Sequence, residues 1–125
     1  GDAAITVGVG KIQKRDELLI ACAKDTLYEA IDSIKVGMRF KELSEILEKS
    51  IRSRGFVPLY NFCGHGIGKK PHEEPEIPNY LDGKSSKAGP KIKNGMVFCL
   101  EPMICQKDSK PIILENKWDV VSADN

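Results

Sequence analysis

The chain of 125 residues has 19 lysine and arginine residues against 18 aspartate and glutamate residues, which gives a formal net charge of +1. This balance excludes the strongly basic composition typical of polyanion-binding domains, so we expect no direct nucleic-acid partner. The longest uninterrupted apolar run, from Leu18 to Ala23, has six residues. A membrane-spanning helix needs about 20, so we expect no membrane partner either.

The first ten residues favour a strand. Residues 3–9 are small or β-branched and are followed by Gly10, which predicts a buried strand. The segment lacks the basic and apolar regions of a secretory signal, so we expect a cytoplasmic protein. It also lacks an initial methionine, and we expect the sequence to be a piece of a longer protein.

Two amphipathic helices are predicted next. Apolar residues recur at spacings of three and four from Leu19 to Ile34, which predicts a helix that begins near Gln13 and closes at Gly37. The same spacing predicts a second helix ending at Gly55. The predicted apolar faces are Leu19, Ala23, Leu27, Ala30, Ile31 and Ile34 in the first helix and Leu43, Ile46, Leu47 and Ile51 in the second.

Strands and turns are predicted after Gly55, because the helical period disappears there. The clearest candidate strands are residues 96–100, 111–114 and 118–121, and residues 82–94 read as a polar surface loop. Two helices followed by several strands indicate an α+β fold. The four cysteines form no C-x-x-C pair, which favours free thiols over a disulfide framework or a structural zinc site.

The segment 61–75 contains both histidines of the chain. Three glycines lie around His65, at positions 64, 66 and 68, and permit tight turns and the close approach of another group. A single histidine in such a turn is more often structural than functional. The second histidine, His72, is followed by Glu73 and Glu74, and this clustering favours a functional site.

A carboxylate, Glu101, ends the apolar run 96–100 and is followed by Pro102. Glutamate is seldom buried without a partner, so an inward Glu101 implies a cation, either a metal ion or a lysine or arginine. Asp2 is a further acid whose position alone carries no role. Mixed nitrogen and oxygen ligands would suit Mn, Fe, Co or Zn better than Mg or Ca.

Taken together, three motifs resemble one enzyme family. Residues 63–68 read Cys-Gly-His-Gly-Ile-Gly, residues 72–75 read His-Glu-Glu-Pro, and residues 101–103 read Glu-Pro-Met. In order and spacing they resemble the methionine aminopeptidases of the bacterial type I class. Residues 1–6 also resemble that family's Gly-Asp-x-x-x-Thr segment, so the likeness spans the whole chain. It implies a pita-bread fold, of which this chain would be one αα-plus-β half with an antiparallel sheet.

The resemblance also implies residue roles and a cofactor. Asp2, His65 and Glu101 would be ligands of a centre of two divalent metal ions (Co, Mn, Fe or Zn), and Glu101 would also accept a proton from the attacking water. His72 would contact the scissile amide. Cys63, Pro71 and Trp118 would border the substrate site.

The chain departs from that family in two respects. Pro71 stands where the family often has an aromatic residue, which affects the methionine pocket. The family's centre uses two aspartates, one histidine and two glutamates, and only Asp2, His65 and Glu101 are matched here. We therefore expect residues 1–125 to be a single incomplete metallopeptidase domain, with the missing ligands and a further active-site histidine outside the sequence.

The predicted function is removal of the N-terminal methionine from new proteins whose second residue is small. The substrate would be a peptide or nascent-chain N-terminus, and Lys69 and Lys70 could contact the ribosome, although adjacent lysines more often face solvent. Two alternatives remain open. One is an Xaa-Pro aminopeptidase or prolidase of the same fold, against which Cys63 and Met103 argue. The other is a non-catalytic binding module of that fold.

Overall fold

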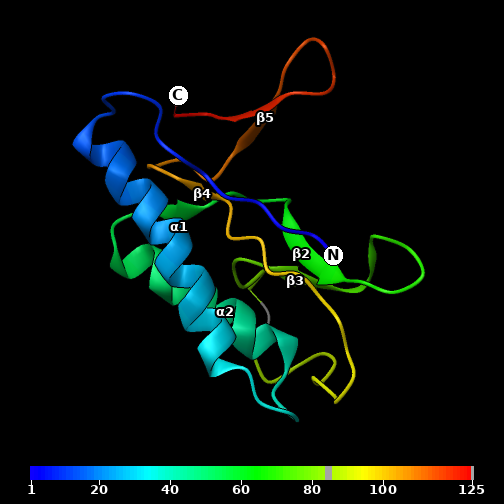
Figure 1. The fold of residues 1–125 in the computed structure, drawn as a ribbon. Coiled ribbons are helices and arrows are strands. Elements are labelled where there is room, and N and C mark those ends of the chain that lie inside the picture. Colours follow the sequence, from blue (N-terminus) through cyan, green and yellow to red (C-terminus); the bar gives the residue numbers. More distant parts are fainter. Residues whose placement is uncertain (84–85, 125) are drawn as a thin grey trace.

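The computed structural model describes residues 1–83 and 86–124, which form two helices and six short strands (Figure 1). Helix α1 spans Lys14–Ser33 and α2 spans Phe40–Ser53. The strands are β1 (Val57–Pro58), β2 (Cys63–Gly66), β3 (Glu73–Pro78), β4 (Ile104–Cys105), β5 (Pro111–Ile113) and β6 (Val120–Ser122). They pair as β1–β4, β2–β3 and β5–β6, each pair antiparallel. The predicted α+β class with antiparallel pairing is confirmed, as three two-stranded sheets.

Both predicted helices are present, and the predicted apolar face of α1 is confirmed in part. Ala30 is fully buried and Leu19 and Ile34 pack against the core, whereas Ile31 is exposed. The other fully buried residues of α1 are Cys22 and Thr26, which a search for the larger apolar side chains did not include. Small residues at the line 22–26–30 allow α1 to lie close against α2, which the larger aliphatic side chains would prevent.

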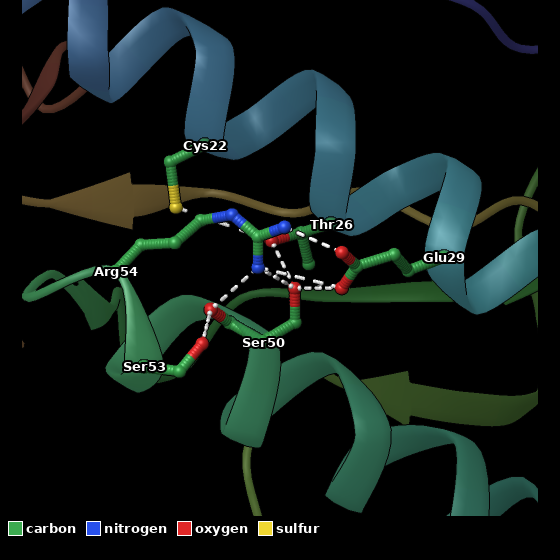
Figure 2. Close-up of polar contacts among 6 residues, drawn as sticks. All are labelled: Cys22, Thr26, Glu29, Ser50, Ser53 and Arg54. Carbon is green, nitrogen blue, oxygen red and sulfur yellow. Dashed lines mark hydrogen bonds and ion pairs between the residues drawn. The ribbon is translucent and has the colours of Figure 1, made fainter.

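A polar cluster joins the two helices within this interface (Figure 2). Thr26 Oγ1 and Ser50 Oγ are 2.8 Å apart, and Ser50 donates to Glu29 Oε2 at 2.6 Å. The Arg54 guanidinium pairs with Glu29 and also donates to Ser50 Oγ at 2.8 Å. These bonds, led by the one from Arg54, lower the pKa of the Glu29 carboxyl. Each buried hydroxyl is satisfied, so the close approach of the helices leaves no orphaned polar group here.

The apolar core lies between α2 and the strands. Its main cluster consists of Ala30, Phe40, Leu43, Leu47, Ile77 and Ile92. A smaller cluster of Cys22, Ile51 and Phe56 extends it along α1. The core thus anchors β3 through Ile77, and Phe98 stacks edge-on against Phe40 with ring centroids 5.2 Å apart. Strand β3 and the segment around Phe98, which lie beside the histidine motif, are therefore both held by the helices.

Three sequence-based expectations about strands are corrected. Residues 3–9 form no strand, and Ile5, Val7 and Val9 are 86%, 66% and 88% exposed. A strand forms only against a partner, and none of the described residues pairs with this segment. Residues 96–100 make a single isolated bridge, between Phe98 and Gly66. The predicted strand 118–121 begins only at Val120, because residues 115–118 make the turn of the β5–β6 hairpin.

The predicted strand 111–114 is confirmed as β5, one residue shorter. The predicted loop 82–94 lies largely at the surface, but Ile92 is buried in the core, and its backbone N–H donates to Met38 O at 2.7 Å. Lys84 and Ser85, within that loop, lie outside the described residues. Over the described residues, neither helix combines the length and the hydropathy that crossing a membrane requires.

Candidate metal centre

The β2–β3 hairpin positions the histidine motif. His65 pairs with Glu76 across the hairpin, and the register shifts between His65 and Gly66. Such an irregularity redirects the side chains of the bulged strand. His65 is only 7% exposed, so the hairpin turns its imidazole into the molecule.

The glycines of this motif allow the backbone to pack closely against two other segments. A Cβ at Gly64 would lie 2.3 Å from the Cys99 carbonyl oxygen, and one at Gly66 would lie 2.3 Å from the Glu74 carbonyl oxygen. Neither separation is compatible with a side chain. The predicted close approach is confirmed, and the approaching groups are the segment that leads to Glu101 and the adjoining strand β3.

The imidazole of His65 has a defined orientation. Its Nδ1 lies 3.1 Å from the Gly66 carbonyl oxygen, and because a carbonyl can only accept, Nδ1 carries the proton of the neutral ring. The lone pair is then on Nε2, which is buried and has no hydrogen-bond partner among the described residues. Glu101 Oε1 lies 3.2 Å and Asp2 Oδ2 lies 3.8 Å from this nitrogen. Three electron-pair donors therefore face one another, an arrangement that a cation between them would stabilise.

This geometry fits a divalent transition metal. Ligands about 2.0–2.2 Å from one ion are separated by roughly 3–4 Å from each other, as Glu101 Oε1 and Asp2 Oδ2 are from His65 Nε2. The Nδ1 hydrogen bond to a backbone carbonyl is also the arrangement usual for a metal-binding histidine. The sequence-predicted ligands Asp2, His65 and Glu101 are thus brought together, although they come from the chain start, β2 and the segment before β4.

A fourth donor, Cys99, belongs to the same cluster. Its Sγ and the donor atoms of Asp2, His65 and Glu101 all lie within 4.8 Å of one another. Cys99 Sγ lies 3.0 Å from Glu101 Oε1. Burial, followed by the bond to Glu101, raises the pKa of the Cys99 thiol to about 11. Sequence reasoning missed this role, although Cys99 precedes Glu101 by two residues, the spacing that places side chains on one face of an extended segment.

Asn79 is a second residue that the sequence did not single out. It is fully buried, and its Nδ2 donates to the Glu101 backbone carbonyl at 2.6 Å. It therefore fixes the backbone that carries the carboxylate. No motif marks Asn79, because its role depends on β3 folding back beside residues 99–101.

His72 and Pro71 lie beside the cluster. The rings of His65 and His72 are in contact, with centroids 4.2 Å apart and planes inclined by 47°. Pro71 and Asp2 line a cavity of about 290 Å³ together with Gly1, Ile67, Gly68, Lys69 and Lys70. The loop between β2 and β3 thus forms one wall of a hollow that Gly1 and Asp2 also line.

The remaining predicted site residues lie at different distances from this centre. Cys63 begins β2, is half-buried, and has a thiol pKa that is raised by burial and by the charge of Glu76. Trp118 lies in the turn between β5 and β6 and is 86% exposed. In Figure 1 that hairpin projects away from the chain start that carries Asp2. The structure therefore does not bring Trp118 to the cluster.

The chain matches the metallopeptidase family M24 over residues 1–122. It is 66% identical over 125 residues to a methionine aminopeptidase of Helicobacter pylori, covering 99% of this chain and 49% of that protein. It is 37% identical to one of Clostridium perfringens, covering 98% of this chain and 48% of that protein. The chain thus spans about half the length of these relatives.

Solved structures agree with these matches. The crystal structure of a methionine aminopeptidase from Thermotoga maritima superposes with a TM-score of 0.90 at 32% identity, covering 96% of this chain and 47% of that one. The corresponding enzyme from Rickettsia prowazekii gives a TM-score of 0.83 at 26% identity, covering 92% and 46%. The expected pita-bread fold is confirmed, in part, and the chain belongs to the metallopeptidase family M24.

Proposed function

We propose that this chain is part of a methionine aminopeptidase that uses two divalent metal ions to remove N-terminal methionine. One observation carries the proposal: the buried, unpartnered Nε2 of His65 faces the carboxylates of Glu101 and Asp2. The relatives named above support the choice of activity. Since the chain spans about half of their length, we propose that the other ligands and the rest of the domain lie outside these 125 residues.

Asp2, His65 and Glu101 are the proposed protein ligands. Divalent ions bound there would supply Lewis acidity toward the first peptide bond and would activate water near neutral pH. Glu101 is partly exposed, with 33% of its side chain accessible. A carboxylate that reaches solvent in this way can take a proton from water and return it to the leaving amine.

His72 is the proposed hydrogen-bond donor to the substrate carbonyl. Its ring contacts His65 on one side and is otherwise exposed, so it borders the centre without being enclosed by it. A donor at this position stabilises the charge that develops on the carbonyl oxygen during attack. Holding His65 and His72 in contact keeps that donor close to the reacting bond.

Cys63, Pro71 and Trp118 are the proposed residues of the substrate site. Support for Pro71 is its place in the cavity that also includes Asp2. Because proline is smaller than an aromatic side chain, Pro71 fills less of the cavity than the aromatic residue that the family often has there. Trp118 could reach a substrate only if the β5–β6 hairpin is held differently in the whole protein. A cytoplasmic location and a ribosome contact through the exposed Lys69 and Lys70 stay predictions.

The test is a comparison of peptides with the full-length protein that contains this chain. The protein is stripped with a chelator, reloaded with Co²⁺ or Mn²⁺, and given Met-Ala-Ser and Ala-Pro-Ser. We expect metal-dependent release of methionine from the first peptide. The His72→Ala variant should lose about 10²- to 10³-fold in kcat, whereas Lys24→Ala, a control at an exposed residue of α1, should not.

Three outcomes would contradict the proposal or the residue roles it assigns. Cleavage of Ala-Pro-Ser in preference to Met-Ala-Ser would favour the Xaa-Pro peptidase alternative. Binding of metal with no cleavage of either peptide would favour a non-catalytic module of this fold. Full activity after both Glu101→Ala and His72→Ala would refute the proposed roles of these residues.

A further inference from the structure

One side chain in the cluster has no part in the proposed reaction. Cys99 is 8% exposed, and its Sγ lies 3.0 Å from Glu101 Oε1. The same carboxylate oxygen is the one that lies 3.2 Å from His65 Nε2. The thiol and the imidazole nitrogen therefore meet at a single oxygen atom.

The backbone fixes the thiol in this place. The Cys99 N–H donates to the His65 carbonyl oxygen at 2.9 Å, and the His65 N–H donates to Cys99 Sγ at 3.4 Å. Gly64 makes this approach possible, because any side chain there would collide with the Cys99 carbonyl. Two hydrogen bonds with His65 of β2 thus hold Cys99 before Glu101 is considered, one donated by its backbone N–H and one accepted by its sulfur.

The single thiol proton has two acceptors within reach. The His65 carbonyl oxygen is 3.5 Å from Sγ and already accepts the Cys99 backbone N–H, whereas Glu101 Oε1 is 3.0 Å away. Hydrogen bonds to a charged acceptor are the stronger ones. The thiol therefore donates to Glu101, and its sulfur accepts from the His65 N–H.

We propose that Cys99 is a positioning residue, whose thiol holds Glu101 Oε1 toward His65 Nε2 so that both donors meet the same metal ion. This inference rests on the proposed metal centre. The His65 side chain is 9% exposed and its Nε2 is unpartnered, which independently marks the position of the cation. Asn79 fixes only the Glu101 backbone, so within residues 1–83 and 86–124 the hydrogen bond that orients the carboxylate comes from the thiol.

The experiment measures metal affinity in the full-length protein. Mn²⁺ and Co²⁺ are titrated calorimetrically into metal-free wild type, Cys99→Ala and Cys99→Ser, and absorption spectra of the Co²⁺ forms are recorded. Cys99→Ser keeps a donor and Cys99→Ala removes it. Cys105→Ala and Cys105→Ser, at a buried thiol in β4 outside the cluster, are the matched controls. Thermal unfolding checks each fold, and Cys99→Val replaces Cys99→Ala if alanine prevents folding.

We expect Cys99→Ala to weaken metal binding about 10- to 100-fold, as loss of a residue that orients a ligand typically does. Cys99→Ser should recover most of that affinity, and neither Cys105 variant should change it. Wild-type affinity in Cys99→Ala would overturn the inference. A sulfur-to-Co²⁺ charge-transfer band that is present in the wild type and absent in Cys99→Ser would also overturn it, because the thiol would then be a metal ligand. Failure of the wild type to bind metal would refute the proposed metal centre itself, and this inference with it.

Discussion

Replacing Gly64 by alanine tests whether close backbone packing assembles the metal centre. The new Cβ would lie 2.3 Å from the Cys99 carbonyl oxygen, about 0.7 Å inside the 3.0 Å that such contacts respect. Since the obstacle is backbone, β2 and residues 98–101 must separate by about that amount. The 2.9 Å bond from Cys99 N–H to the His65 carbonyl would then stretch to about 3.6 Å and be lost.

The expected cost follows from these two effects. Loss of the hydrogen bond costs about 1 kcal/mol, and the overpacking costs about 1–3 kcal/mol, so we expect a destabilisation of roughly 2–4 kcal/mol. His65 would also move away from Glu101, and a displacement approaching 1 Å in a catalytic site can cost about 10²-fold in rate. Both stability and kcat/KM for Met-Ala-Ser should therefore fall together.

The assay combines urea unfolding with peptide kinetics on the full-length protein. Gly55→Ala is the control, because Gly55 follows α2 with a φ of +79° and has open space around its Cα. That variant should lose about 1 kcal/mol and keep its kcat/KM. Wild-type stability and activity in Gly64→Ala would refute the packing argument.

Further predictions concern the helix interface, acid stability and the second histidine. Ser50→Ala leaves the buried Thr26 hydroxyl without its 2.8 Å partner, so urea unfolding should show a loss of about 1–3 kcal/mol with kcat/KM unchanged. Because Arg54 and Ser50 lower the pKa of Glu29 in the folded state, this carboxylate stabilises the protein above the ordinary glutamate pKa of about 4.3. That contribution is lost as the pH falls through the lower folded-state value. The difference in free energy of unfolding between wild type and Glu29→Gln should therefore narrow from pH 6 to pH 3. A constant difference would contradict the stabilising role of the Glu29 carboxylate. His72→Ala should bind Mn²⁺ with wild-type affinity while losing kcat, and a parallel loss of metal would make His72 a ligand instead.

The helices could be predicted from the sequence because their apolar residues repeat with the helical period over many turns. The prediction of α2 placed Leu43, Leu47 and Ile51 in the core, where they are fully buried. The prediction for α1 was right for Ala30, but it included the exposed Ile31 and omitted the buried Thr26. Thr26 is fully buried because Ser50 on α2 satisfies its hydroxyl, and no property of α1 alone contains that information.

The strands and the site could be predicted only in part from the sequence, because they depend on contacts between residues that are distant along the chain. Residues 3–9 have the composition of a strand but pair with none of the described residues. The motifs identified Asp2, His65 and Glu101, because the metal-binding chemistry needs those residue types in that order. Cys99 was not found in the same way, because no motif marks it and its place beside His65 depends on Gly64, which lets β2 approach the Cys99 carbonyl.

The metal content of the full-length protein tests the central claim most directly. Elemental analysis after dialysis against Co²⁺ or Mn²⁺ would be made on wild type and on His65→Ala. This variant keeps the carboxylates of Asp2 and Glu101 but lacks the buried nitrogen donor. We expect two divalent ions per wild-type chain and a clear loss of bound metal in the variant. Equal metal content in the two proteins would contradict it, because His65, Glu101 and Asp2 would then not be the metal centre.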